Sequence, residues 1–414
     1  MVTVKPFKAL RPDLEYADKC AALPYDVMSS DEAREMVKDN PFSFLHIDKA
    51  EIDLDKSIDI YDPKVYTKAR ENLDKFEKEG VYINDCEEKY YFYRQIMDGR
   101  AQTGIVGCAS IDDYMENRIK KHEFTRADKE IDRIKHVDIC SAHTGPIFLA
   151  YKDSSVLDKI IFDETQKEPL YDFVAEDGVR HTVWATSDRE IDTKIKNAFS
   201  SLDALYIADG HHRAASAVKV GVKRREEAVN YTGDEEFNFF LSVIFPANTL
   251  KIMDYNRLLK DYNGMTPNEF LKVVEEKIGT VELYEKQGPC RPQERHSVSM
   301  LVDGKWYIVK FYDKICNSES PVERLDCAIL QNYLLKPILG IEDPRSDKRI
   351  DFAGGIRGLE YLEQRCREDM KLAIAMYPTS LDELMSVADS GNVMPPKSTW
   401  FEPKLRSGLL IHKI

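Results

Sequence analysis

The chain has 414 residues, of which 43% are hydrophobic and 32% charged, a composition typical of a globular protein with two or three domains. The formal net charge of −14 argues against a protein that coats nucleic acid, because phosphate neutralisation requires clustered lysine and arginine. The one tight basic cluster, Lys223-Arg224-Arg225, is followed at once by two glutamates. We therefore expect no nucleic-acid partner.

The cysteines and the N-terminus indicate the compartment. The eight cysteines form no Cys-x-x-Cys pair and show no Cys/His spacing suited to zinc, so we expect reduced structural thiols. The first residues, Met1 to Pro6, lack the apolar core of a signal peptide, and no apolar run is long enough to span a bilayer. These features predict a cytoplasmic protein without a membrane partner, and they leave the oligomeric state open.

Residues 1–111 are predicted to form the first of three domains, a compact α/β unit. Ser29 to Glu32 has the spacing of a capping box, and an Asp-Gly turn at 98–99 joins two runs with strand composition. The expected elements are, in order, a helix from Ser29 to Lys38, a strand at 42–47, a helix at 63–79 and a hairpin of 89–97 with 102–111.

Residues 112–250 are predicted to form the second domain. Helices and strands alternate along it, which implies an α/β or α+β fold. The expected elements are a helix at 126–139, strands at 147–151, 171–174 and 181–185, a helix at 189–200 and a closing strand at 237–245.

Residues 205–217 of this second domain hold the most informative motif of the chain. Four apolar residues read as the end of a buried strand, Asp209-Gly210 makes a turn, and the alanine-rich run that follows favours a helix. His211-His212-Arg213 therefore falls in the first turn of a helix, where free N–H groups and the helix dipole attract anions. Gly210 also lets a ligand approach the backbone closely, so the motif predicts a phosphate site.

A simpler interpretation of this motif is a capped helix. In that interpretation Asp209 is an N-cap, and the two histidines are partly exposed helix residues satisfied by their neighbours. The complete run favours a site, because it places a carboxylate, two imidazoles and a guanidinium on one strand-to-helix turn.

Residues 251–414 are predicted to form a third, α/β domain. Its expected elements are a helix at 267–278, a hairpin of 297–302 with 306–311, a helix at 321–335 and an apolar strand after a Ser407-Gly408 turn. Arg345, Lys348 and Arg349 precede Gly354-Gly355, a glycine pair that could hold an anion or simply turn the chain.

The motif at 206–213, Tyr-Ile-Ala-Asp-Gly-His-His-Arg, resembles the signature of a large bacterial and archaeal family of unknown function, the DUF1015 domain family. That family is similar to the ParB/sulfiredoxin superfamily, in which a Gly-x-x-Arg turn binds nucleotide phosphates. Sulfiredoxins need a cysteine where this chain has His211, and ParB proteins usually have Glu-Arg there, so the motif is closer to the free-serine kinases of the superfamily. The resemblance implies a mixed-sheet α+β protein whose second domain is a ParB/sulfiredoxin-like phosphate-binding domain.

Three further segments match the pattern of this family. Superfamily kinases have a His-Glu pair upstream of the phosphate turn, and this pair matches His122-Glu123 here. The alternative for Glu123 is a solvated residue near a helix start. Leu23 to Val27 also matches, which makes Asp26 a candidate substrate contact or a residue of a local turn. The tail at 395–404 matches through its lysines and hydroxyls. The alternative is a tail with a structural role only.

The resemblance implies a small-molecule kinase that phosphorylates a free hydroxyl, such as that of L-serine. The implied roles are donor-phosphate binding by Gly210, Arg213 and Lys404, orientation of Mg²⁺ or the acceptor by Asp209, support of the phosphoryl group by His211 and His212, proton acceptance by Glu123, and substrate contacts by Asp26, His143 and Thr144. For His143 and Thr144 the alternative is a plain loop.

The donor and the reaction direction remain open at this point. ATP, ADP or pyrophosphate could supply the phosphoryl group, and the chain has no Walker-type Gly-x-x-x-x-Gly-Lys-Ser/Thr loop. One alternative is a phosphatase that acts on a small phosphomonoester. The other is a non-catalytic, ParB-like nucleotide-binding protein, against which stand the acidic charge and the lack of a recognition helix with a basic face.

Overall fold

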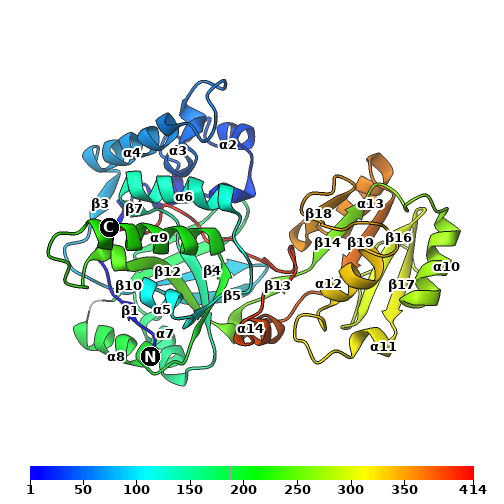
Figure 1. Ribbon diagram of the computed structural model, residues 1–414. Helices are drawn as coiled ribbons and strands as arrows, with labels where there is room; N and C mark the ends of the chain where they lie inside the picture. The colour runs from blue at the N-terminus through cyan, green and yellow to red at the C-terminus, as the bar shows by residue number, and fades with distance from the viewer. Residues whose placement is uncertain (187) are drawn as a thin grey trace. The chain divides into compact units, whose positions relative to one another are not determined.

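The computed structural model describes residues 1–186 and 188–414. The chain divides into two compact units, a larger one of residues 1–250 with 403–414 and a smaller one of 251–402. Both combine helices with sheets, so the predicted α+β class is confirmed (Figure 1). The boundary predicted at residue 111 lies inside the larger unit, because strands from both sides of it share one sheet. Residues 403–414, predicted in the third domain, belong to the larger unit.

A large mixed sheet forms the centre of the larger unit. Its long strands β5 (Arg100–Ser110) and β12 (Phe239–Pro246) pair antiparallel. On its other edge, β12 pairs in parallel with β8 (Ile147–Tyr151). The predicted hairpin is confirmed as β4 (Tyr91–Met97) and β5. The remaining strands are β6 (Ile119–Lys120), β11 (Leu205–Asp209), β10 (Arg180–Ala185), β9 (Tyr171–Val174) and β1 (Val4–Lys5), in the order β6-β11-β8-β12-β5-β4-β10-β9 with β1 on β5.

Helices cover this sheet closely. In Figure 1, α6 (Ala127–Cys140) and α9 (His211–Glu227) run side by side, and α4 (Pro63–Lys78) packs on α6. Helix α9 approaches its neighbours so closely that a Cβ on Gly221 would lie 2.4 Å from the carbonyl oxygen of Phe237. The apolar faces of α7 (Ser155–Glu164) and α8 (Arg189–Ser200) complete the core, and α5 (Ile111–Met115) follows β5 directly.

A second, small sheet joins the two ends of the chain. Its order is β3 (Tyr82–Asn84), β2 (Ala9–Pro12), β21 (Ile411–Lys413) and β7 (Ala142–His143). Beside it lies a separate core with α1 (Ala17–Cys20), α2 (Ser30–Met36), α3 (Leu45–Asp48) and α4. The predicted capping box is present, with Ser29 and Glu32 bonding each other's backbone at the start of α2.

The strand predicted at 42–47 is wrong, because the chain forms the short helix α3 there. Phe44, Leu45, Ile47 and Asp48 are all buried, which is the i, i+3, i+4 pattern of a helix face. A short apolar run does not distinguish a strand from a buried helical turn, and here the packing against α4 decides.

The smaller unit is an antiparallel sheet with helices. The strand order is β15 (Gly279–Leu283), β17 (Lys305–Phe311), β16 (Ser297–Val302), β19 (Leu372–Met376), β14 (Tyr255–Leu259) and β18 (Ile350–Gly354), and β13 (Ile252–Met253) pairs separately with β20 (Trp400–Phe401). Its main helices are α10 (Pro267–Lys277), α13 (Leu359–Glu368) and α14 (Leu381–Asp389), with α11 (Asp313–Cys316) as a single turn. The helix predicted at 321–335 is shorter, with α12 (Asp326–Ile329) continuing as a π-helix at Leu330–Leu335.

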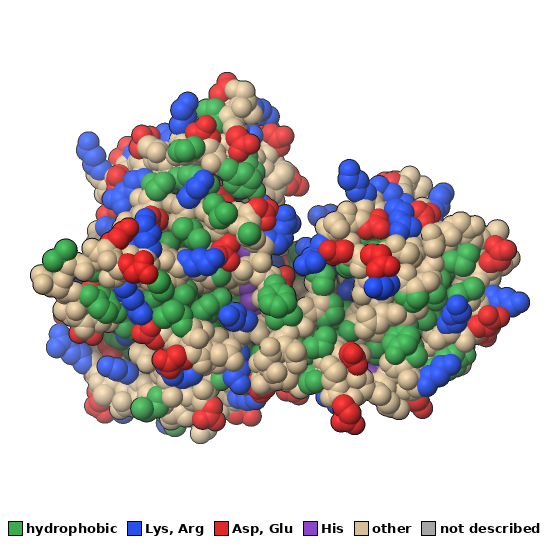
Figure 2. Space-filling model, in the orientation of Figure 1, with side chains coloured by type: hydrophobic (Ala, Val, Ile, Leu, Met, Phe, Trp, Pro, Cys, Tyr) green, Lys and Arg blue, Asp and Glu red, His purple; other side chains and the backbone are tan. Residues whose placement is uncertain are grey.

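All eight cysteines are free, and six of them are buried. Acidic and basic side chains are interspersed over the face of the molecule shown in Figure 2. Within the described ranges, none of the helices has both the length and the apolar character of a membrane span.

The C-terminal tail is anchored in the larger unit by a buried histidine. His181 is 0% exposed and lies between the rings of Tyr93 and Phe173. Arg406 Nε donates to His181 Nε2 at 3.3 Å, so the ring proton is on Nδ1, which lies 2.7 Å from the Tyr93 hydroxyl. Burial, reinforced by the charge of Arg406 and opposed by Asp177, lowers the pKa of His181 to about 3.

The low pKa of His181 predicts acid sensitivity. Unfolded histidine takes up a proton near pH 6.5, whereas folded His181 does so only near pH 3. Between these values the unfolded state binds more protons, so its free energy falls relative to the folded state by up to about 1.4 kcal/mol per pH unit as the pH decreases. Thermal unfolding of wild type and His181→Gln at about pH 7 and about pH 5 measures this, and the variant should lose less stability on acidification. Equal losses in the two proteins would contradict the assignment.

Candidate functional site

The predicted phosphate turn joins the end of strand β11 to the start of helix α9. Gly210 stands between them with φ +90° and ψ 32°, in the left-handed region, and it is the N-cap residue of α9 without a side-chain cap. Asp209 accepts from the N–H of Gly210 at 2.8 Å. Asp209 is therefore not the N-cap that the simpler interpretation requires, and its carboxylate does not cover the N–H groups of the first turn of α9.

Lys404 from the tail reaches this turn and pairs with Asp209. Lys404 Nζ lies 3.0 Å from Asp209 Oδ2, and the Lys404 side chain is only 12% exposed. The carbonyl of Lys404 accepts from Gln95 Nε2 at 2.9 Å, which fixes the tail on strand β4. Burial would raise the pKa of Asp209, but the charges of Lys404 and Arg213 outweigh it and hold that pKa well below its usual range. The turn thus carries an ionised carboxylate beside two cations.

Arg213 folds back beneath the turn. Its Nη1 donates to the carbonyl of Pro146 at 2.6 Å, and its Nε would lie 3.3 Å from a Cβ at position 210. A Cβ on Gly145 would lie 3.5 Å from Nη1, so both glycines make room for the guanidinium. Among the described residues, Arg213 Nε is buried and has no hydrogen-bond partner. The guanidinium therefore keeps a donor that protein groups do not use.

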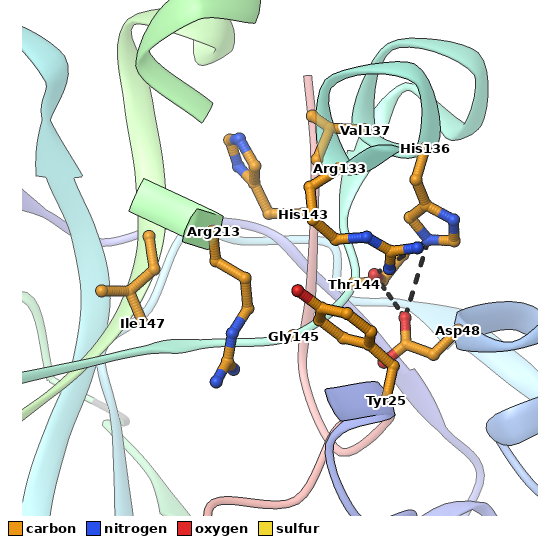
Figure 3. Close-up of a pocket in the computed structure, with 10 residues that line it drawn as sticks. All are labelled: Tyr25, Asp48, Arg133, His136, Val137, His143, Thr144, Gly145, Ile147 and Arg213. Carbon is orange, nitrogen blue, oxygen red and sulfur yellow. Dashed lines mark hydrogen bonds and ion pairs between the residues drawn. The ribbon is translucent and has the colours of Figure 1, made fainter. Parts of the chain in front are cut away.

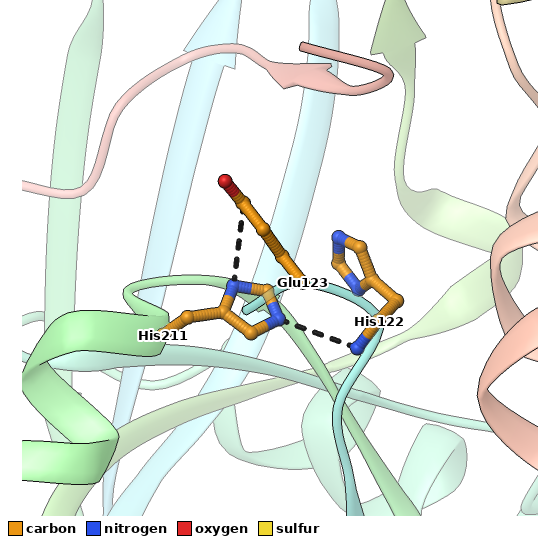
Figure 4. Close-up of side chains that lie close together, drawn as sticks. All are labelled: His122, Glu123 and His211. Atoms are coloured by element: carbon orange, nitrogen blue, oxygen red, sulfur yellow. Dashed lines mark hydrogen bonds and ion pairs between the residues drawn. The ribbon is translucent and has the colours of Figure 1, made fainter. Parts of the chain in front are cut away.

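The predicted base and the first histidine of the motif meet at this turn. His211 is 5% exposed, and its Nδ1 lies 3.9 Å from Glu123 Oε2, while the Glu123 side chain is 47% exposed (Figure 4). The His122 ring packs edge-on against His211 at 4.4 Å, and its backbone N–H faces His211 Nε2 at 3.5 Å. The structure thus brings together residues that lie 89 positions apart in the chain.

Both rings in this group are uncharged at neutral pH. Burial lowers the pKa of His211 well below its ordinary value, and the neighbouring His122 lowers it further. Burial also lowers the pKa of His122 to about 4, against an opposite influence of the Ile207 backbone and Asp209. The positive charge at the turn therefore comes from Arg213 and Lys404 rather than from these imidazoles.

His212 and Asp26 occupy the other side of the turn. The N–H of Arg126 donates to His212 Nε2 at 3.0 Å. Burial lowers the pKa of His212, and the charge of the exposed Asp26 is the strongest influence in the opposite direction. Tyr25 of the 3-10 helix Tyr25–Val27 lines the same cavity as Arg213, so the segment around Asp26 lies near the turn.

A small cavity of about 20 Å³, the space of one water molecule, lies next to Arg213. In Figure 3 the Arg133 guanidinium lies over the Tyr25 ring, at 4.0 Å from its centroid, between Arg213 and the pair of Asp48 with His136. Asp48 accepts from Thr144 Oγ1 at 2.7 Å. The cavity is lined by Tyr25, Asp48, Arg133, His136, Val137, His143, Thr144, Gly145, Ile147 and Arg213.

The structure thus gathers all the predicted site residues around one turn and one cavity. His143 and Thr144 line the cavity, although each has a protein partner, since His143 Nδ1 lies 3.2 Å from His412 Nδ1. Sequence reasoning missed Arg133 and His136. Their spacing on helix α6 carried a signal, because polar residues recur at i and i+3 on a face that also holds the apolar Val137.

The glycine pair of the smaller unit serves packing. A Cβ on Gly354 would lie 2.6 Å from the ring of Trp400, and one on Gly355 would lie 2.5 Å from Asp254 Oδ1. Two of the three cations considered with it have carboxylate partners, Asp343 for Arg345 and Asp347 for Arg349. The glycines are needed for close approach, and the arrangement does not point to an anion.

Comparisons with known proteins give a family and remote structural likenesses. The family described as "Protein of unknown function (DUF1015)" matches residues 4–328. No curated protein matches the chain. Among solved structures the chain is similar to SbnI with C-terminal truncation from Staphylococcus aureus, at 10% identity and TM-score 0.39, covering 73% of this chain and 85% of that one.

Two other solved structures have similar sequence identities and TM-scores to this chain. A free serine kinase in complex with AMP shares 14% identity at a TM-score of 0.35, covering 70% of this chain and 85% of that one. A conserved hypothetical protein from Pyrococcus furiosus shares 16% identity at a TM-score of 0.35, with coverages of 72% and 91%.

The left-handed conformation of Gly210 predicts an unequal response to alanine at two glycines. Gly80 also has a left-handed φ, of +74°, but nothing lies within 4 Å of where a Cβ on it would stand, so Gly80→Ala should cost only the backbone strain of about 1–2 kcal/mol. Gly210→Ala adds a close contact with Arg213 Nε at 3.3 Å and should cost more. Urea unfolding of both variants compares the costs. An equal or smaller loss for Gly210→Ala would show that the turn tolerates a side chain.

Proposed function

This chain belongs to the DUF1015 family, and we propose that it is a kinase that transfers a phosphoryl group to the hydroxyl of a small molecule. One observation carries the proposal: Arg213, Lys404 and the start of helix α9 converge on a turn that Glu123 also reaches. Two cations and free N–H groups bind phosphate, and a carboxylate near them can accept the proton of a hydroxyl. The motif resemblance points to the same reaction class.

The donor phosphates bind at the start of α9. The N–H groups of its first turn lack intrahelical partners, and Gly210 supplies no side-chain cap. Arg213 Nε adds a donor without a protein partner among the described residues, and Lys404 adds a second positive charge. Preorganised donors and charges of this kind stabilise the charge that spreads over the equatorial oxygens during phosphoryl transfer. ATP, ADP and pyrophosphate all present the required oxygens.

Glu123 receives the proton during the transfer. The acceptor oxygen forms a bond to the terminal phosphorus of the donor, the bond from that phosphorus to the leaving phosphate oxygen breaks, and the hydroxyl proton moves to the Glu123 carboxylate. Neutral His211 lies beside this carboxylate, with its Nδ1 3.9 Å from Glu123 Oε2. His212 supports the phosphoryl group from the other side of the turn.

Asp209 has a positioning role in this scheme. Both of its oxygens have protein partners, the N–H of Gly210 on Oδ1 and Lys404 on Oδ2, which fits a carboxylate that holds Lys404 toward the phosphates. Direct ligation of Mg²⁺ by Asp209 would require Lys404 to move. If Mg²⁺ accompanies the donor, it supplies charge neutralisation for the phosphates.

The acceptor binds between the turn and the cavity beside Arg213. The charge of Asp26 acts on His212, and Thr144 and His143 line the cavity. A free hydroxyl compound such as L-serine is the acceptor that the motif resemblance suggests.

Two variants separate binding from chemistry. Arg213→Ala removes the guanidinium under the turn and should weaken nucleotide binding at least about tenfold, because a charge-assisted hydrogen bond contributes about 1.5–3 kcal/mol. Glu123→Gln should leave binding unchanged and reduce turnover about 100-fold or more, because it removes the proton acceptor. Calorimetry with ATP, ADP and pyrophosphate, together with a turnover assay, measures both effects.

Lys223→Ala is the matched control. Lys223 lies on the same helix α9 but about 15 Å farther along it, where it pairs with Asp138 at 2.7 Å. This variant should bind and turn over like wild type. Unchanged nucleotide affinity in Arg213→Ala would refute the binding role of the turn. Release of phosphate from phosphoserine without a donor, with no phosphorylation of serine when a donor is present, would identify a phosphatase instead.

A further inference from the structure

The proposed reaction leaves one buried group at the site without a role. His122 is 2% exposed, and within the described part of the chain neither of its ring nitrogens has a partner at full hydrogen-bond geometry, although the Ile207 backbone lies near the ring. Leaving a buried polar group without a partner costs about 1–3 kcal/mol. Such a group in a folded protein calls for an explanation, and a bound ligand is one.

The surroundings of His122 supply further ligand atoms of the same kind. His122, Glu123 and His211 can each offer one nitrogen or oxygen such that these atoms all lie within 4.8 Å of one another. Figure 4 shows the three side chains grouped together. Ligand atoms bound about 2.1 Å from a tetrahedral ion are about 3.4 Å apart. The distance of 3.9 Å between His211 Nδ1 and Glu123 Oε2 is close to that value. The Glu123 side chain is half-exposed, so it has room to move the short distance toward His211 that ion binding requires.

We propose that His122, Glu123 and His211 form a binding site for a divalent transition-metal ion, with Zn²⁺ as the expected occupant. Two imidazole nitrogens and one carboxylate oxygen are a ligand set that Zn²⁺ accepts, and three protein ligands leave a fourth position for water or another oxygen ligand. Mg²⁺ and Ca²⁺ prefer oxygen ligands, so this set selects against them. The site shares Glu123 and His211 with the proposed phosphoryl transfer, but ion binding does not require that reaction.

The electrostatics of the cluster favour a cation. Both rings are buried, and each imidazole can offer a nitrogen lone pair to an ion. The negative charge of Asp209 acts on both rings, and Lys121 opposes it at His211. An ion at this position would therefore have the carboxylates of Glu123 and Asp209 near it.

Binding changes the tautomer of His211. Its Nε2 faces the backbone N–H of His122 at 3.5 Å, so without an ion the ring proton is on Nδ1. An ion on Nδ1 moves this proton to Nε2, and the ring must turn slightly from the N–H of His122. At 3.5 Å that hydrogen bond is weak, so its loss costs little. Glu123 binds the ion through Oε2, the oxygen that faces His211, and keeps its second oxygen.

Titration of the chelator-treated, full-length protein with Co²⁺ and Zn²⁺, without nucleotide, tests the site. Co²⁺ reports its own ligand geometry through visible absorption, and calorimetry gives the affinity for Zn²⁺. Wild type should bind one ion per chain and show the absorption of a low-coordinate Co²⁺ site. His122→Ala and Glu123→Gln should each weaken binding at least about tenfold.

His212→Ala is the matched control, because His212 follows His211 on the same helical turn but its ring is bonded to Arg126. It should bind Zn²⁺ as wild type does, and circular dichroism should show all variants folded. No binding by wild type, or equal affinity in wild type and His122→Ala, would overturn the proposal. Because ion binding is measured without nucleotide, this outcome is separate from failure of the kinase, which the Arg213→Ala and turnover experiments detect.

Discussion

The left-handed conformation of Gly210 is the constraint on which the site depends. With φ of +90° it turns the chain from strand β11 directly into helix α9, without a side-chain cap. The missing Cβ is also what allows Arg213 to fold back, since its Nε lies 3.3 Å from where that atom would be. One backbone angle therefore exposes the N–H groups of a helix start and places a guanidinium under them.

Burial then determines which groups carry charge. His211 is buried and neutral, whereas Lys404 and Arg213 remain charged and hold the pKa of Asp209 low. The tail that carries Lys404 is fixed at several points, through Gln95, through the Arg406 contact with His181, and through strand β21. A cation from the last residues of the chain is thus a structural part of a turn in its middle.

Local signals predicted most elements of the fold. The capping box at Ser29, the Asp-Gly hairpin and the apolar run before Asp209 involve neighbouring residues only, and each forms as expected. The strand predicted at 42–47 was wrong, because a short apolar run is too short to show whether its period is that of a strand or of a helix. Contacts with α4 favour the helix that forms there. The boundary at residue 111 falls within one sheet because β5 and β12 pair across it, which no local pattern reports.

The sequence by itself determined the turn, since the order of strand, Asp-Gly and alanine-rich helix specifies where Gly210 and Arg213 stand along the chain. The tertiary structure decided what surrounds them: Lys404 on Asp209, Arg133 on Tyr25, and His122 against His211. These pairs are far apart in sequence, and their contacts follow from sheet pairing and helix packing rather than from residue spacing. The charge states follow from the same cause, because desolvation of an imidazole or a carboxylate exists only once the chain has folded around it.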